Sequence, residues 1–204
     1  MPLRDHFRRP NRFVTWYSVQ GMWACVMLRH LNRVLPEGYR GYPKRVRRDD
    51  YDPHVEEEFA LRLVTNNLDD EQLVASVEFV SPENKKGAES RRVFVTRCVE
   101  LLRRGVCLSV MDIVTTHDFN LYTDLMDHFG HVDASMGAPS HSLYAATLRP
   151  RKEKAGARIE AWTHQLNVGQ VLPTIPLFIS DEACLPLDLE ATYEETCDTL
   201  RIRD

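Results

Sequence analysis

Apolar side chains near the start of the chain recur at intervals of three and four residues, the spacing of one helix face. Thr15 is a suitable N-cap for this helix, and Pro36-Glu-Gly38 would end the run. The predicted stripe comprises Trp16, Val19, Trp23, Val26, Met27, Leu31 and Val34. A second helix is predicted over residues 89–104, with Gly105 at its C-terminal stop.

Other segments have the character of β-strands. Residues 59–66 and 73–81 are separated by a polar turn, which predicts a hairpin. Residues 106–114 are almost continuously apolar, a pattern typical of a strand covered on both faces. Residues 39–58 are too polar to assign. Further along we expect a helix over 119–129, strands over 142–148 and 158–166 joined by a basic turn over 149–156, extended backbone over 173–176, and a last helix over 189–200.

The order of these elements predicts a single α/β domain with a mixed central sheet and flanking helices. The 204 residues are 43% hydrophobic, which is enough to bury a core and excludes disordered, collagen-like and coiled-coil chains. We expect the core of the domain over residues 13–150 and a C-terminal extension, with strands and a helix, over 151–204.

The net charge of −4 conceals strong segmentation. Residues 1–48 carry 11 Lys/Arg and two Asp/Glu, whereas residues 49–78 carry one Lys/Arg and ten Asp/Glu. This balance selects no partner by itself. Five cysteines without a Cys-x-x-Cys pair argue against a disulfide framework and a thiolate zinc site. No apolar run approaches the ~20 residues that span a bilayer, so we expect a cytoplasmic protein without a membrane partner; the oligomeric state stays open.

Glu78 is an acidic residue inside an otherwise apolar predicted strand. Strand alternation places it on one face with Val74, Ser76 and Val80. Burying an unpaired charge is costly, so such a carboxylate normally has a partner, a bound metal or a raised pKa. We therefore predict that Glu78 either binds a hard cation such as Mg²⁺ or forms an ion pair with an arginine of the following helix.

The residues after this strand include further candidates, because loops at the carboxyl ends of strands often build sites in α/β sheets. Lys85 or Lys86 would neutralise a phosphate or orient a water molecule, unless they are ordinary solvated lysines. Asp112 would be a second metal ligand or a strand-end acid that caps a backbone turn. Candidate phosphate-binding residues are Asn84, Arg91 and Arg92, with a solvated helix face as the alternative for the arginines.

Several segments together resemble a bacterial family known as domain of unknown function 4058. The most specific are Val-Glu-Phe-Val-Ser-Pro-Glu-Asn-Lys at 77–85 and Leu-Pro-Thr-Ile-Pro-Leu at 172–177. Residues 2–8, 31–39, 104–112 and 185–189 extend the resemblance over most of the chain. The family name implies no activity.

A more distant similarity concerns the fold. The Glu-x-x-Ser-Pro strand end, followed by a helix and a Gly-Val-led strand ending in Asp, is similar to the Uma-type, PD-(D/E)XK nuclease-like proteins. That similarity implies a core of helix, three strands, helix and strand. It further implies that Glu78 is the acid of the third core strand and Asp52, beside Asp49 and Asp50, the upstream metal ligand. The motif lysine is expected at position 80, which is Val80 here, so Lys85 or Lys86 would replace it.

Two functions follow from these observations. The first is Mg²⁺-dependent phosphodiester hydrolysis, in which Glu78 and an upstream aspartate hold the metal ion and a lysine assists. The second is a nuclease-like domain without catalysis that binds nucleic acid or protein. A third, more general alternative is a structural or protein-interaction module whose basic helix faces solvent.

Overall fold

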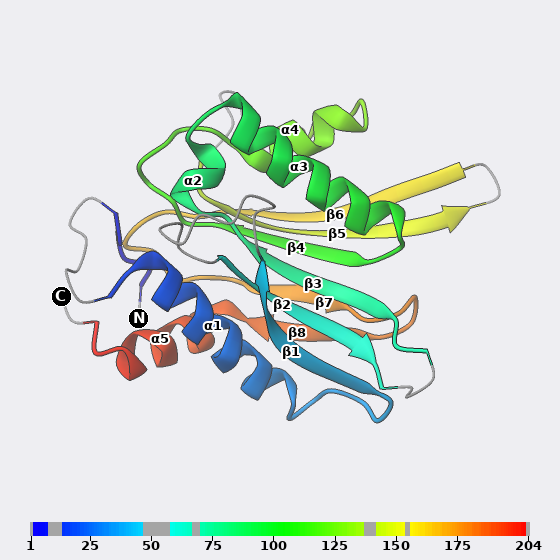
Figure 1. The fold of residues 1–204 in the computed structure, drawn as a ribbon, viewed down its shortest axis with the longest axis horizontal. Helices are drawn as coiled ribbons and strands as arrows, with labels where there is room; N and C mark the ends of the chain where they lie inside the picture. The colour runs from blue at the N-terminus through cyan, green and yellow to red at the C-terminus, as the bar shows by residue number, and fades with distance from the viewer. Residues whose placement is uncertain are drawn as a thin grey trace.

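The computed structural model describes residues 2–7, 14–46, 58–66, 70–136, 142–153 and 156–202. Their centre is a six-stranded sheet whose strands lie side by side in sequence order (Figure 1). Neighbouring strands are antiparallel, except that β3 and β4 are parallel and are connected through a helical crossover. The strands are β1 (Tyr39–Val46), β2 (Glu58–Thr65), β3 (Leu73–Phe79), β4 (Cys107–Asp112), β5 (Tyr144–Glu153) and β6 (Gly156–Gln165).

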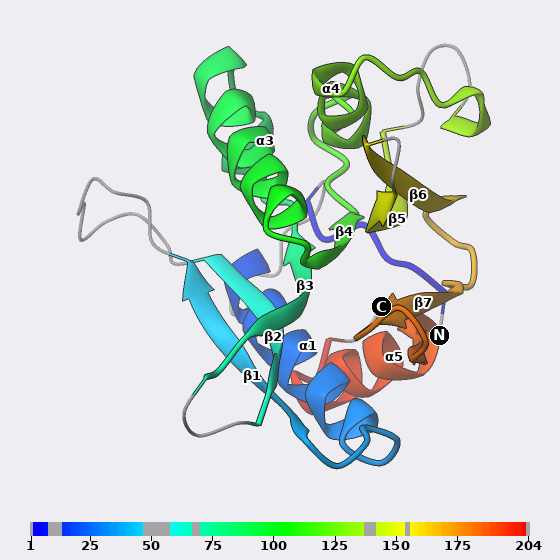
Figure 2. The ribbon, with the colours of Figure 1, turned by 90° about the vertical axis from the view of Figure 1, so that its right-hand side faces the viewer.

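Helices cover both faces of this sheet, as the two views in Figures 1 and 2 show. One face carries α1 (Trp16–Leu31), α5 (Leu189–Thr199) and a two-stranded sheet of β7 (Thr174–Phe178) and β8 (Cys184–Asp188). The other face carries α3 (Ala88–Arg103) and α4 (Leu121–His128). The single-turn helix α2 (Pro82–Lys85) follows β3, and a short 3-10 helix, η1 (Ala134–Met136), follows α4. The fold is therefore a mixed α/β domain with an apolar core on each side of the sheet.

The first helix begins where the sequence predicts. Thr15 is its N-cap, and the Thr15 side chain accepts a hydrogen bond from the Ser18 backbone N–H at 3.2 Å. This bond satisfies one of the N–H groups that a helix start leaves without an internal partner. The helix ends at Leu31, and Val34 is 50% exposed. The buried stripe is thus one turn shorter than the periodicity suggests.

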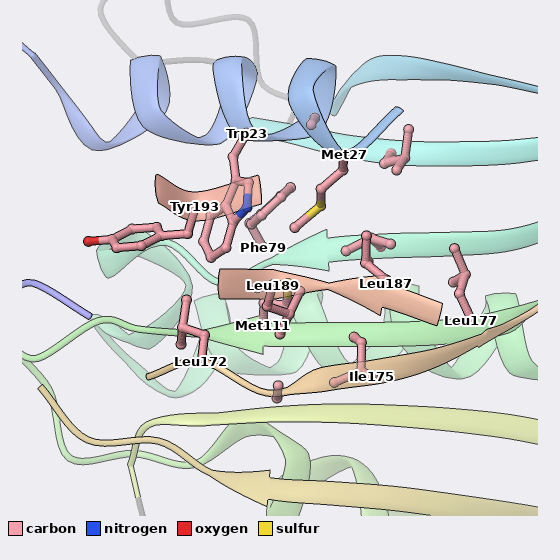
Figure 3. Packing of buried hydrophobic residues seen from close by; sticks show 14 of the residues in the cluster. Trp23, Met27, Phe79, Met111, Leu172, Ile175, Leu177, Leu187, Leu189 and Tyr193 are labelled. Atoms are coloured by element: carbon pink, nitrogen blue, oxygen red, sulfur yellow. The ribbon is translucent and has the colours of Figure 1, made fainter. Parts of the chain in front are cut away.

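The larger core lies between α1, the central sheet and the small β7–β8 sheet (Figure 3). Trp23 is fully buried there, with its ring 5.5 Å from that of Phe79 and 5.1 Å from that of Tyr193. Its indole N–H donates to the Thr192 hydroxyl at 3.0 Å. The apolar stripe of α1 is therefore core, with its polar indole group satisfied by α5.

The hairpin predicted from the sequence is confirmed, and so are the helix and the strand that follow it. β2 and β3 pair antiparallel, with Ala60 opposite Glu78. α3 then returns the chain so that β4 runs parallel to β3. Gly105 follows this helix with a φ of +83°, a left-handed conformation that glycine adopts without a steric penalty.

The basic turn predicted over 149–156 is wrong. β5 continues to Glu153 and β6 begins at Gly156, and their register extends to this pair. Arg149 and Arg151 both pair with Glu160 of β6, at 2.5 and 3.2 Å. The charges of Arg149 and Arg151 therefore belong to cross-strand ion pairs of a long hairpin, which a local charge count does not distinguish from a loop. β1 and β8 were not predicted.

The C-terminal segment contributes to the same cores as the rest of the chain. β6 is an edge strand of the central sheet, and α5 packs against α1, where His30 Nε2 lies 2.7 Å from Glu195 Oε2. The N-terminal residues are held here too, since the Leu3 backbone N–H donates to the Gln170 carbonyl at 2.8 Å. Within the described ranges, no helix combines the length and apolar character needed to cross a bilayer.

Candidate functional site

Glu78 lies near the end of β3, on the face that α3 covers. Its neighbours Val77 and Phe79 belong to the core beneath α1, whereas Val80 belongs to the core beneath α3 and α4. The predicted alternation is therefore confirmed from Ala75 to Val80. It is wrong at the start of β3, where a register shift opposite Leu63 and Val64 lets Val74 pack against the core beneath α1 and Leu73 against the other core. Only 1% of the Glu78 side chain is exposed, so the carboxylate is held inside the protein.

Two arginines and one hydroxyl surround the Glu78 carboxylate. Ser76 donates a hydrogen bond to Oε1 at 2.7 Å, and Arg62 Nη1 lies 2.5 Å from the same oxygen. Arg97 of α3 places Nη2 3.4 Å from Oε2. Burial by itself would raise the pKa of Glu78, but the charges of Arg97 and Arg62 outweigh it and lower the pKa below the ordinary value. Glu78 is therefore ionised and paired, which is the ion-pair alternative of the sequence analysis.

Glu58 is a second buried acid in the same place, and the sequence analysis missed it. It is the first residue of β2 and is 5% exposed. Its Oε1 accepts hydrogen bonds from Ser81 Oγ at 2.6 Å and from Asn84 Nδ2 at 2.8 Å. Its Oε2 lies 3.5 Å from Nη2 of Arg97, the same nitrogen that faces Glu78. One guanidinium group thus joins acids from two adjacent strands.

The turn after β3 supplies the remaining contacts to Glu58. Ser81 is the N-cap of α2, and its hydroxyl accepts a hydrogen bond from the Asn84 backbone N–H. The Asn84 side-chain oxygen accepts one from the Ser81 backbone N–H, which completes a capping box. Asn84 is only 3% exposed and its amide donates to Glu58. Asn84, which the sequence analysis proposed for phosphate binding, is therefore buried and its amide donates to Glu58 instead.

Lys85 and Asp112 form a second buried ion pair. Lys85 Nζ lies 2.9 Å from Asp112 Oδ2, and neither side chain is exposed. Lys85 also donates to the carbonyls of Val114 and Ser142, at 3.4 and 3.3 Å. Asp112 Oδ1 accepts from the Val114 backbone N–H at 3.0 Å, so this acid caps a turn at the end of β4. Burial raises the pKa of Asp112 to about 6, against the opposing charge of Lys85.

The other basic candidates are exposed or partly exposed, and each has an acidic neighbour. Lys86 is 68% exposed and lies 3.4 Å from Glu83. Arg92 is 74% exposed and pairs with Glu89 at 2.8 Å. The remaining one, Arg91, faces Asp124 at 3.7 Å and stacks over the Phe119 ring at 4.0 Å.

The structure therefore divides the predicted residues into three groups. Glu78 and Asn84 belong to one buried polar network with Glu58, Arg62, Ser76, Ser81 and Arg97. Lys85 and Asp112 form their own buried pair, and the third group lies on or near the surface. Asp49, Asp50 and Asp52 lie outside the described residues. Arg62 is the one sequence feature that points to the missed residues, because it is a lone charged residue in an otherwise apolar predicted strand.

The network does not fit a Mg²⁺ ion as it stands. Mg²⁺ needs carboxylate oxygens that are free to coordinate it. Each Oε1 already accepts hydrogen bonds, and both Oε2 atoms face Arg97. Across the described ranges, no group of three His, Cys, Asp or Glu side chains is placed to hold a metal ion. Arginine supplies the positive charge that a metal would otherwise bring.

Comparison of the chain with protein-family models, with curated proteins and with solved structures finds no match. The resemblances drawn from the sequence motifs therefore stay predictions.

Proposed function

We propose that this chain is a nuclease-like domain without catalysis that acts by binding, with nucleic acid as its partner. The observation that carries the proposal is the pairing of Glu78, the predicted catalytic acid, with Arg62 and Arg97 in the interior. The order α1, β1, β2, β3, α3, β4 supports the nuclease-like part, because it is the order of helix, three strands, helix and strand implied by the resemblance.

The absence of catalysis is supported by the chemistry of both buried groups. Metal-assisted hydrolysis needs a metal ion to activate water and to stabilise the charge that develops on phosphate. Glu78 has its charge matched by arginines instead. Lys85 is fully buried beside Asp112 and would have to leave that partner to reach a phosphate.

Nucleic acid is the partner favoured by the exposed end of α3. Arg103 and its successor Arg104 are exposed there, while Arg92 and Lys86 are exposed near the other end of the helix. Lys and Arg contacts to phosphate supply most of the affinity that does not depend on sequence. The proposed contact is therefore electrostatic and made to the phosphate backbone.

Catalysis is tested by incubating the protein with single- and double-stranded DNA and with RNA, in Mg²⁺ and in Mn²⁺. We expect no cleavage above that of a Glu78→Gln variant purified in the same way. Cleavage that requires Glu78 would overturn the proposal and support the hydrolase instead.

Binding is tested by fluorescence anisotropy with labelled 20-nucleotide strands and duplexes at low and physiological salt. We expect affinity that falls steeply with salt and drops several-fold in the Arg103→Gln/Arg104→Gln double variant. Glu78→Gln should leave the affinity unchanged, since this residue is buried. No binding at low salt would refute nucleic acid as the partner and leave a protein-interaction module.

A further inference from the structure

We infer that the Arg97 guanidinium occupies the position of a divalent cation between Glu58 and Glu78, and that removing this side chain exposes a binding site for Mg²⁺ or Mn²⁺. The inference rests on the proposed function, because it concerns the two buried carboxylates that would hold a metal ion in a catalytic domain. It concerns a metal site that the unaltered chain does not offer.

The first support is the position of a single atom. Arg97 Nη2 lies 3.5 Å from Glu58 Oε2 and 3.4 Å from Glu78 Oε2. One positive centre therefore bridges two carboxylates that come from neighbouring strands. A Mg²⁺ ion shared by the two acids would lie about 2.1 Å from each oxygen, so the carboxylates would have to move closer together once the guanidinium is gone.

The second support is the orientation of the two carboxylates. Oε1 of Glu58 is held by Ser81 and Asn84, and Oε1 of Glu78 by Ser76 and Arg62. These bonds leave both Oε2 atoms directed at Arg97. Glu78 Oε2 is buried and accepts no hydrogen bond from the described residues, so the charge of Arg97 is what stabilises it.

The third support is access from solvent. The Arg97 side chain is 23% exposed, whereas those of Glu58 and Glu78 are 7% and 1% exposed. Shortening Arg97 would thus open a path from the surface to the two oxygens. Mg²⁺ is commonly bound through one or two carboxylates and retains several waters, which this path would admit.

The test is the substitution Arg97→Ala, which keeps a strong helix former in α3. Without the guanidinium, the two carboxylates repel each other and the variant should unfold at a lower temperature. Adding 10 mM MnCl₂ or MgCl₂ should raise its unfolding midpoint by about 3 °C relative to NaCl of equal ionic strength. Calorimetric titration with Mn²⁺ should show binding at least tenfold tighter than to the unaltered protein.

Two matched variants make the result specific. Arg92→Ala removes an exposed arginine from the same helix and should respond to Mn²⁺ like the unaltered protein. Arg97→Ala/Glu78→Gln should lose the Mn²⁺ response, because one of the two carboxylates is removed. Arg97→Gln offers a milder form of the same test and should show the same Mn²⁺-dependent rise.

The inference is overturned if neither Arg97 variant responds to Mn²⁺ or Mg²⁺. It is also overturned if the unaltered protein binds Mn²⁺ through Glu78, since Arg97 would then not exclude the ion. The first result leaves the proposed function standing, because the unaltered protein would still hold Glu78 paired with arginines. The second result would also count against the proposed function, and the cleavage assay then decides whether the unaltered protein hydrolyses nucleic acid.

Discussion

The buried pair of Lys85 and Asp112 makes the stability of this protein depend on pH in a way that one substitution should reveal. Lys85→Met removes the ammonium group and keeps an unbranched side chain of similar length. Asp112 then remains in a fully buried position without the charge that lies 2.9 Å away in the unaltered protein. Removing one partner of a buried ion pair typically costs about 3–5 kcal/mol.

The size of this loss should vary with pH. Burial raises the pKa of Asp112 to about 6 even beside Lys85, so without Lys85 the pKa rises further. Below pH 5 the Asp112 carboxyl is protonated in both proteins. There we expect the variant to be less stable by about 1–2 kcal/mol, because the hydrogen bonds from Lys85 to the Val114 and Ser142 carbonyls are missing. Above pH 6 the unaltered folded protein has released the Asp112 proton, as the unfolded chain has, whereas the folded variant keeps it. Its deficit should therefore grow by up to about 1.4 kcal/mol per pH unit until its own folded pKa is reached.

The assay is urea unfolding followed by circular dichroism at pH 5, 6, 7 and 8. Adding Asp112→Asn to Lys85→Met should recover stability at pH 8, because the neutral amide still accepts the Val114 N–H bond. Lys86→Met, at an exposed position, should change stability by less than about 0.5 kcal/mol at every pH. A Lys85→Met deficit that is the same at pH 5 and pH 8 would refute this account.

Two further predictions concern the larger core. Trp23→Ala should destabilise the protein by about 4 kcal/mol in urea unfolding, because it empties a fully buried site between α1 and α5, whereas Val34→Ala at a 50%-exposed position should have an effect below about 0.5 kcal/mol. His6 lies with Nε2 2.6 Å from the Tyr193 hydroxyl, and burial, aided by the Arg4 charge, lowers the pKa of His6 from 6.5 to about 4. The unfolded chain therefore binds this proton first on acidification, and about 3 kcal/mol of stability should be lost between pH 6.5 and 4. A His6→Gln variant should lack this part of the pH profile; identical profiles for the two proteins would contradict the assignment.

The elements that periodicity predicted well are those whose pattern is local. α1 and α3 repeat apolar residues at helical spacing, and the β2–β3 hairpin has two runs around a polar turn. The predicted basic turn over 149–156 was wrong because charged residues were taken to indicate a solvent-exposed loop. Arg149 and Arg151 lie in a strand because Glu160 lies beside them on β6, and that pairing becomes visible only once the two strands are in register.

The candidate site divides in the same way. Sequence alternation by itself placed Glu78 inside an apolar strand, on the face opposite to Val77 and Phe79, because side-chain direction along a strand follows from the backbone. It also limited the possibilities to a metal ion or an arginine. Only the tertiary structure decided between these two partners. Arg62 and Glu58 come from β2 and Arg97 from α3, and they meet Glu78 through strand register and helix packing. Which charge neutralises a buried carboxylate depends on distances across the fold, and those distances are absent from the order of residues along the chain.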